Sequence, residues 1–177
     1  MKKAFIDLFL LFLVFVTFIC AQNDVLPRDL EGLNLGDTFD KPQDGYTLTE
    51  SKSENPDYAH YSKHKSVRGV GMDFTLSMYS ISTYKGKIYF LSELTSRTGS
   101  ALSFEWFENF HKKYKKYVKK EKKNKVKGKT VIDRTYEDKQ TKITISLTKA
   151  ESSIEANAYL FVVEDIEISS KVKSSKK

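Results

Sequence analysis

Apolar and polar residues alternate along the middle of the chain, beginning at Met72. Between 72 and 79 apolar side chains occupy every second position, and Asp, Thr, Ser and Tyr occupy the positions between them. This period of two is typical of a strand with one buried face. The turn-forming run Tyr84-Lys85-Gly86-Lys87 follows, and 88–94 is again rich in β-formers. We therefore predict a β-hairpin over 72–94.

After Gly99 the period becomes helical. Aromatic side chains recur at three- and four-residue spacing, which places them on one helix face; they are Phe104, Phe107, Phe110, Tyr114 and Tyr117. Ser103 is a suitable N-cap, and Gly128 is a suitable stop. The pattern predicts one long amphipathic helix, with lysines crowded at its C-terminal end.

Strand patterns resume after this helix, over 130–136, around 143–147 and over 159–168. The element order is then β-β-α-β-β-β. Short turns between neighbouring strands favour antiparallel pairing. We predict an α+β domain over 66–170: a single antiparallel sheet of about five strands, with one amphipathic helix packed on one face.

The flanking segments show little periodicity. Residues 22–65 contain many turn formers and predict an irregular lead-in, with one short strand near 46–49. Residues 171–177 carry four lysines and predict a basic, flexible tail.

Residues 1–21 have the order of parts of a secretory signal peptide. Lys2 and Lys3 precede an apolar run over 8–19, and Ala21 precedes the expected cut. The apolar run would rise roughly 18 Å as a helix, too short for a bilayer core of about 30 Å. A lipid on Cys20 is the alternative, although Ile19 is larger than lipid-attachment sequences favour. An uncleaved anchor is the third reading, because Ile19 is also imperfect for cleavage.

Cys20 is the only cysteine, and cleavage after Ala21 removes it. The exported chain would then have no disulfide in a compartment that permits them. It also contains no Asn-X-Ser/Thr acceptor for glycans. Together these absences favour a bacterial envelope protein, periplasmic or secreted.

Charge is concentrated in one segment. Residues 112–129 contain eleven lysines and one acid, Glu121, within a chain whose net charge is only +7. The candidate anion-binding side chains are those expected to leave the aromatic stripe of the helix; they are Lys112, Lys113, Lys116, Lys119, Lys120 and Lys123. A solvated helix end is an equally simple reading.

Catalytic and cofactor motifs are not found in the sequence. There is no nucleophile elbow, phosphate-binding glycine loop or zinc-protease motif. Asp57, His60 and His64 offer the spacing of a metal site on one helix face, but three such ligands do not close a site. The acidic pairs Glu105/Glu108 and Glu164/Asp165 lack the facing arrangement that glycoside hydrolysis needs.

The sequence therefore favours a non-enzymatic binding module without a cofactor, recruited to an anionic surface through the lysine-rich helix end. Its expected partners are a phospholipid surface, lipopolysaccharide or an acidic protein. Lysine without arginine disfavours sequence-specific binding to nucleic acid.

Two alternatives stay open. One is an inhibitor or immunity-type protein that plugs an acidic enzyme with the loop 84–89. The other is a hydrolase centred on Asp57, His60 and His64.

Overall fold

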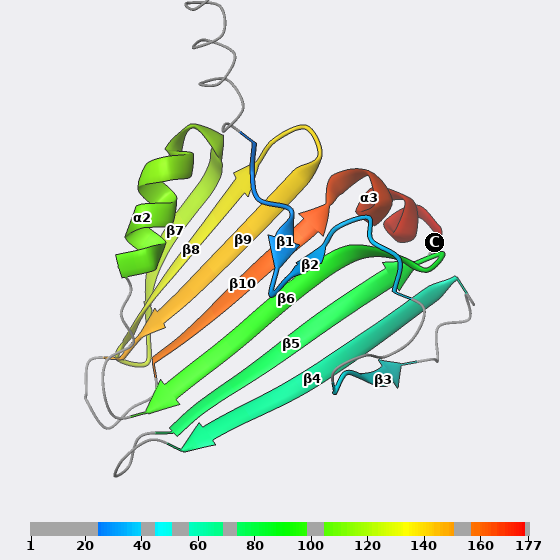
Figure 1. Ribbon diagram of the computed structural model, residues 1–177. Helices are drawn as coiled ribbons and strands as arrows, with labels where there is room; N and C mark the ends of the chain where they lie inside the picture. The colour runs from blue at the N-terminus through cyan, green and yellow to red at the C-terminus, as the bar shows by residue number, and fades with distance from the viewer. Residues whose placement is uncertain are drawn as a thin grey trace, which may run out of the picture.

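The computed structural model describes residues 25–39, 45–50, 57–68, 74–98, 105–150 and 157–175. Within these ranges the main feature is an eight-stranded antiparallel sheet, accompanied by a two-stranded hairpin and two α-helices (Figure 1). The predicted signal peptide, residues 1–21, lies outside the described residues.

The large sheet consists of two four-stranded meanders joined side by side. The first meander is β3 (Thr47–Glu50), β4 (Tyr58–Arg68), β5 (Phe74–Tyr84) and β6 (Lys87–Thr98). The second is β7 (Val118–Val126), β8 (Lys129–Glu137), β9 (Thr141–Lys149) and β10 (Asn157–Asp165). Pairing of β6 with β10 joins them, so the strand order is β3-β4-β5-β6-β10-β9-β8-β7. The sheet therefore ends in β7 on one side and β3 on the other.

Between the meanders the chain forms α2 (Glu105–Tyr114) and a 3₁₀ turn, η1 (Lys115–Tyr117). A short hairpin, β1 (Asp29–Leu30) and β2 (Leu33–Asn34), precedes the sheet, and α3 (Ile166–Ser175) follows it. Figure 1 shows α2 and the β1–β2 hairpin in front of the same face of the sheet. We call this the inner face.

The core lies between the inner face and these covering segments. On β9 every second side chain is buried, from Thr141 to Leu147, as one covered face requires. From above, α2 contributes Phe107, which is fully buried, and Trp106, whose ring lies 5.1 Å from that of Tyr159. The N-terminal segment contributes Leu26, Leu35 and Phe39. Burial of these aromatic and aliphatic side chains is the main source of stability.

The opposite, outer face is polar along much of its length, with serine and threonine at many positions. The strand registers also place apolar side chains on this face: Phe74, Leu76, Leu94 and Val126 are exposed, and Met78, Leu160 and Val162 are half-buried. Packing of α3 against β10 and β6 brings Lys173 to Glu164 of this face, 3.3 Å away. Glu164 is also 3.2 Å from Lys142.

The predicted fold class was wrong. The protein is mostly β, with eight strands in the large sheet and two short α-helices among the described residues, rather than about five strands and one helix. Two segments account for most of the difference. Tyr58–Arg68, assigned largely to an irregular lead-in, is an eleven-residue strand. Val118–Val126, assigned to the helix, is also a strand.

Other expectations agree with the structure. The hairpin predicted over 72–94 corresponds to β5 and β6, and the short strand expected near 46–49 corresponds to β3.

The C-terminal region differs from the expectation. The last strand ends at Asp165, earlier than predicted, because a helix starts there. That helix, α3, includes residues 171–175 of the segment expected to be a flexible tail.

Candidate anion-binding surface

The lysine-rich segment folds as the edge of the sheet. Only its first lysines belong to the helix: Lys112 and Lys113 lie in the last turn of α2. Lys116 is in η1, while Lys119, Lys120 and Lys123 are in β7. The long helix predicted for this region was therefore wrong. It ends at Tyr114, and Gly128 is a hairpin residue instead of a helix stop.

A two-residue turn produces this strand. Lys127 and Gly128 both have positive φ, 49° and 75°, as the tight turns that match the twist of paired strands require. Lys85 and Gly86, with φ of 52° and 72°, make the same turn between β5 and β6. β7 then pairs antiparallel with β8 from Val118↔Tyr136 to Val126↔Lys129.

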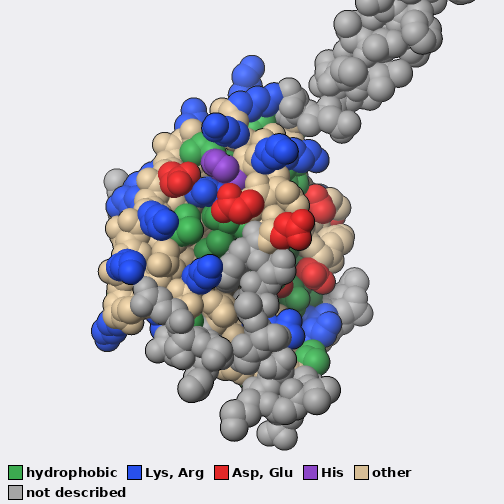
Figure 2. All heavy atoms as spheres, turned by 90° about the vertical axis from the view of Figure 1, so that its left-hand side faces the viewer, with side chains coloured by type: hydrophobic (Ala, Val, Ile, Leu, Met, Phe, Trp, Pro, Cys, Tyr) green, Lys and Arg blue, Asp and Glu red, His purple; other side chains and the backbone are tan. Residues whose placement is uncertain are grey.

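Strand geometry places the lysines on both faces of the sheet. Opposite β8, Glu121, Lys123 and Lys125 take inner-face positions, whereas Lys120 and Lys122 take outer-face positions. Every residue from Lys119 to Val126 is exposed. A view onto this side of the molecule shows lysine and arginine side chains spread widely, with fewer acids among them (Figure 2). We call the lysines of residues 112–129 the basic edge.

Glu121, the one acid in this segment, forms an ion pair with Arg134 of the neighbouring strand. Glu121 accepts a hydrogen bond of 2.9 Å from Nε of Arg134, whose guanidinium also lies 3.4 Å from Glu108 and stacks 4.4 Å above the Phe107 ring. Burial acts to lower the pKa of Arg134, but the hydrogen bond that it donates to Glu121 and the nearby carboxylates outweigh this and raise the pKa. Because Arg134 engages Glu121, this acid does little to offset the surrounding lysines.

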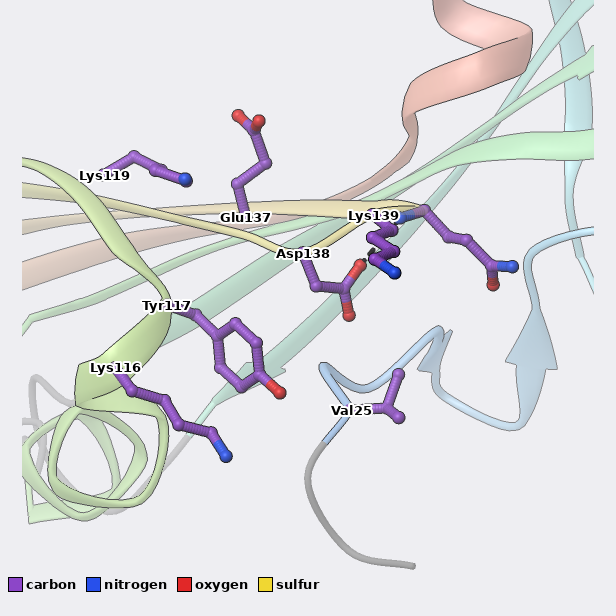
Figure 3. A pocket seen from close by; sticks show the side chains of 8 residues that line it. Val25, Lys116, Tyr117, Lys119, Glu137, Asp138 and Lys139 are labelled. Atoms are coloured by element: carbon purple, nitrogen blue, oxygen red, sulfur yellow. Dashed lines mark hydrogen bonds between the residues drawn. The ribbon is translucent and has the colours of Figure 1, made fainter.

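A recess lies at the start of the basic edge. It has a volume of about 650 Å³, and lysines from three elements reach it: Lys116 from η1, Lys119 from β7 and Lys139 from the β8–β9 turn. Figure 3 shows Tyr117 and Lys116 on one side of the recess and Val25 on the other. The remaining lining residues are Glu137, Asp138 and Gln140.

Asp138 is held by the backbone rather than by the lysines. Its Oδ1 accepts hydrogen bonds from the amides of Gln140 and Thr141, at 2.9 and 2.7 Å. Its Oδ2 accepts one from the amide of Leu26, at 3.1 Å. These three donors stabilise the carboxylate charge. They also fix the N-terminal segment beside the recess.

The residues considered for metal binding do not converge. His60 and His64 share the outer face of β4, but four residues along a strand separate them by roughly 13 Å. His60 instead lies 2.9 Å from the hydroxyl of Ser82. Within the described ranges no three His, Cys, Asp or Glu side chains are grouped as a metal site requires.

The loop invoked for an inhibitor is part of a packed hairpin. Its turn, Lys85-Gly86, is bonded on both sides: the Phe39 amide donates to the Gly86 carbonyl at 2.9 Å, and the Lys85 amide donates to the Asp57 carbonyl at 2.7 Å. Tyr89 is buried. The turn residues Lys85 and Lys87 remain exposed.

A cluster of hydroxyl groups around the Glu93 carboxylate, on the inner face, was not predicted from the sequence. Glu93 accepts hydrogen bonds from the Tyr159 hydroxyl at 2.6 Å and from Thr95 at 3.0 Å, with the Tyr79 hydroxyl at 3.4 Å. Burial, and then the neighbouring carboxylate, raise the pKa of both tyrosines. Cross-strand registers create this cluster, since Tyr79 of β5 pairs with Glu93 of β6, and Tyr159 of β10 pairs with Thr95, two residues along β6 on the same face. The cluster links three strands through side-chain hydrogen bonds.

Comparisons with known proteins add no assignment. No protein-family model matches the chain, and no match was found among curated proteins or solved structures. Within the described part of the chain, no helix has the length and apolar character needed to cross a membrane.

Proposed function

We propose that the protein is an exported, non-enzymatic binding module of a bacterial envelope, recruited to anionic surfaces through the basic edge. One observation carries the proposal. The only acid among eleven lysines is engaged by Arg134, and from Lys119 to Val126 every side chain is exposed on an open sheet edge. The result is a positively charged border that presents lysines on both faces of the sheet.

The physical basis is long-range attraction. A cluster of like charges creates a potential that raises the local concentration of anions and speeds their association. Lysine ammonium groups act as point charges on flexible side chains. They therefore suit a diffuse anionic surface better than a single planar group that is bound by two parallel hydrogen bonds. The binding should therefore be sensitive to salt and tolerant of chemical detail.

Because the lysines lie on an edge strand, they have a second possible role, which is purely structural. Lysines on an edge strand also prevent its open backbone groups from pairing with other chains. That role needs a charged edge but no ligand. The two roles make different predictions, because only recruitment requires affinity for an added polyanion.

A titration separates them. The chain from Gln22 onward, which contains every described element, is titrated with anionic phospholipid vesicles, lipopolysaccharide, polyglutamate and duplex DNA. A variant carrying glutamine at Lys119, Lys120, Lys122 and Lys123 is compared with a control carrying glutamine at Lys63, Lys65, Lys85 and Lys87. The control removes equal charge from β4–β6, on the other side of the sheet.

We expect binding to at least one polyanion, weakened about tenfold or more between 50 and 200 mM salt. The basic-edge variant should lose this binding and the control should keep most of it. Absence of binding to all four ligands would contradict the proposal and leave edge protection as the role of the lysines. Equal losses in both variants would show that net charge, rather than the basic edge, governs recruitment.

A further inference from the structure

The described chain begins beside one end of the basic edge. Val25, the first described residue, lines the same recess as Lys116 and Lys119, and the residue is 60% exposed. Figure 1 shows the chain entering at the end of the molecule where η1 leads into β7. The opposite end of β7, at Val126, lies roughly 27 Å away along the strand. The lysine-rich edge therefore has a near end, beside the chain entry, and a far end.

Covalent connection limits what can lie beside the near end. Between Cys20 and Val25 the backbone spans at most about 18 Å. The apolar run over 8–19 precedes this short connection. A bilayer that holds this run, or a lipid carried on Cys20, would therefore lie next to Lys116, Lys119 and Lys139. Cleavage after Ala21 would instead place a new ammonium group three residues before Val25, which adds positive charge at the same end.

From this placement we infer that the near end of the basic edge is a membrane-docking surface that seats the domain on an anionic lipid bilayer, with Lys116, Lys119 and Lys139 toward the lipid phosphates. The inference rests on the proposed function and specifies its partner and orientation. β7 then projects away from the bilayer, so the far-end lysines Lys125, Lys127 and Lys129 lie farther from the surface than an electrostatic screening length.

Side-chain chemistry at the near end favours lipid over a protein or nucleic-acid partner. Tyr117 presents its ring and hydroxyl at the recess, across from the exposed aliphatic residue Val25 (Figure 3). Tyrosine is enriched where one end of a side chain is apolar and the other is hydrated, as at the headgroup region. Lysines around such a group add attraction to anionic headgroups.

One acid works against this attraction. Glu137 lines the recess together with the three lysines. Asp138, the other acid there, already accepts three backbone amide hydrogen bonds. Neutralising Glu137 should therefore strengthen docking to anionic vesicles.

The first experiment compares two triple variants of the chain from Gln22 onward, each with three lysines changed to glutamine. The near-end variant changes Lys116, Lys119 and Lys139; the far-end variant changes Lys125, Lys127 and Lys129. Binding is measured by co-sedimentation with vesicles of phosphatidylglycerol and phosphatidylcholine. We expect the near-end variant to lose at least tenfold in affinity, the far-end variant threefold or less, and Glu137→Gln to gain about threefold.

The second experiment reads orientation directly. Single cysteines replace exposed, uncharged residues at the two ends, Val25→Cys and Asn124→Cys, and each receives the same fluorophore. Vesicles containing a headgroup-attached quencher should quench the label at position 25 and leave the label at position 124 largely unquenched.

The outcomes distinguish the inference from the proposed function. Vesicle binding with equal quenching at both positions, or with larger losses in the far-end variant, would overturn the orientation and retain the basic edge. Binding to polyglutamate or DNA without binding to vesicles would overturn the lipid assignment alone. If no polyanion binds, the proposed function and the inference that rests on it both fail.

Discussion

Glu121 and Arg134 face each other across β7 and β8, 2.9 Å apart, and this pair sets the register of the lysine-rich strand. Arg134 is almost fully buried, with a side-chain exposure of 10%, whereas Glu121 is 45% exposed. A one-residue slip would turn Glu121 to the outer face and bring a lysine toward the buried guanidinium. The acid among the lysines therefore has a structural role within the edge strand.

Replacement of Arg134 should destabilise the fold more than replacement of its partner. We expect Arg134→Leu to lower the free energy of unfolding by about 2–3 kcal/mol, since it removes the contact with Phe107 and both carboxylate pairs. Glu121→Gln should cost about 1 kcal/mol or less, because Glu121 is partly solvated and Glu108 remains. Urea denaturation of the two variants measures the difference. Equal effects would contradict a central role for the buried guanidinium.

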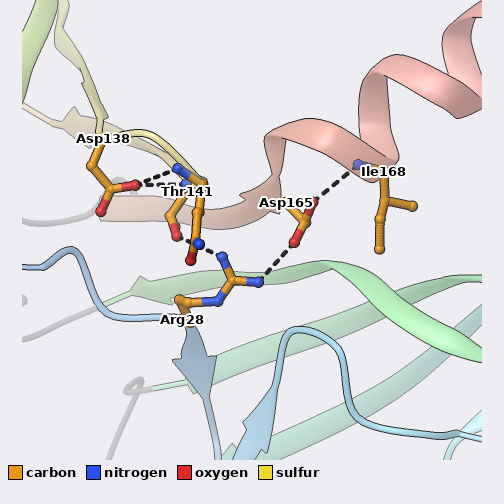
Figure 4. Close-up of polar contacts among 6 residues, drawn as sticks. Arg28, Asp138, Thr141, Asp165 and Ile168 are labelled. Carbon is orange, nitrogen blue, oxygen red and sulfur yellow. Dashed lines mark hydrogen bonds and ion pairs between the residues drawn. The ribbon is translucent and has the colours of Figure 1, made fainter.

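Asp165 joins three parts of the molecule. Its Oδ2 accepts a 2.7 Å hydrogen bond from Arg28 of the N-terminal segment, while its Oδ1 accepts one of 3.0 Å from the Ile168 amide in the first turn of α3 (Figure 4). The second bond has the geometry of a helix N-cap. Arg28 also donates to the Thr141 hydroxyl, at 3.2 Å.

Asp165→Ala should therefore affect both α3 and the N-terminal segment. We expect a loss of about 2–3 kcal/mol from the missing cap and ion pair, with faster amide exchange in both segments. Asp165→Asn can keep the cap, so its loss should be smaller and its exchange should rise mainly around Arg28. As a control, Glu167→Gln breaks an exposed pair with Lys171 and should leave thermal unfolding unchanged.

Buried tyrosines give the fold a specific response to alkali. Burial raises the pKa of Tyr136 from 10.0 to about 12, even though the nearby Arg134 acts to lower it. Between pH 10 and 12 the unfolded chain loses this proton while the folded chain retains it. The corresponding stability is thus fully present below pH 10 and is lost as pH rises toward 12.

We expect Tyr136→Phe to flatten this alkaline decline by about 1–2 kcal/mol, less than a two-unit shift would give without solvent screening. The variant should also be about 1 kcal/mol less stable at pH 8, because the tyrosine hydroxyl lies 3.2 Å from Nδ1 of His111. Unfolding free energies at pH 8, 10 and 11 measure both effects. An unchanged slope above pH 10 would show that Tyr136 does not contribute to it.

The sequence predicted the strands in which apolar and polar residues alternate. At Ile143–Leu147 the apolar side chains line the covered inner face. At Phe74–Met78 they lie on the outer face, where Phe74 and Leu76 are exposed, so the alternation predicted the strand but not which face is buried. The aromatic stripe predicted a helix correctly as far as Tyr114. Beyond Tyr117 the segment VKKEKKNKV has apolar residues only at its ends. Neither period can therefore be read there, and pairing with β8 decides the structure.

A local signal for that strand was nevertheless present. Lys85-Gly86-Lys87 and Lys127-Gly128-Lys129 repeat the same turn sequence, and both form tight hairpins. Reading the first as a turn and the second as a helix stop gave the wrong result for β7. The recess was harder to foresee, because Val25, Lys116 and Lys139 converge only through packing of distant segments.

The lysines of β7 should also keep the edge of the sheet monomeric. Changing Lys120, Lys122 and Lys123 to threonine removes three of the five lysine charges of β7 and leaves a strand-favouring sequence on an open edge. We expect this variant to self-associate with rising protein concentration, as measured by light scattering, while its secondary structure stays unchanged.

The same three positions changed to glutamate reverse the charge but preserve repulsion between edges, so this control should stay monomeric and lose polyanion binding. Self-association of the glutamate variant would contradict edge protection by charge; a monomeric threonine variant would show that the lysines are not needed to block edge pairing.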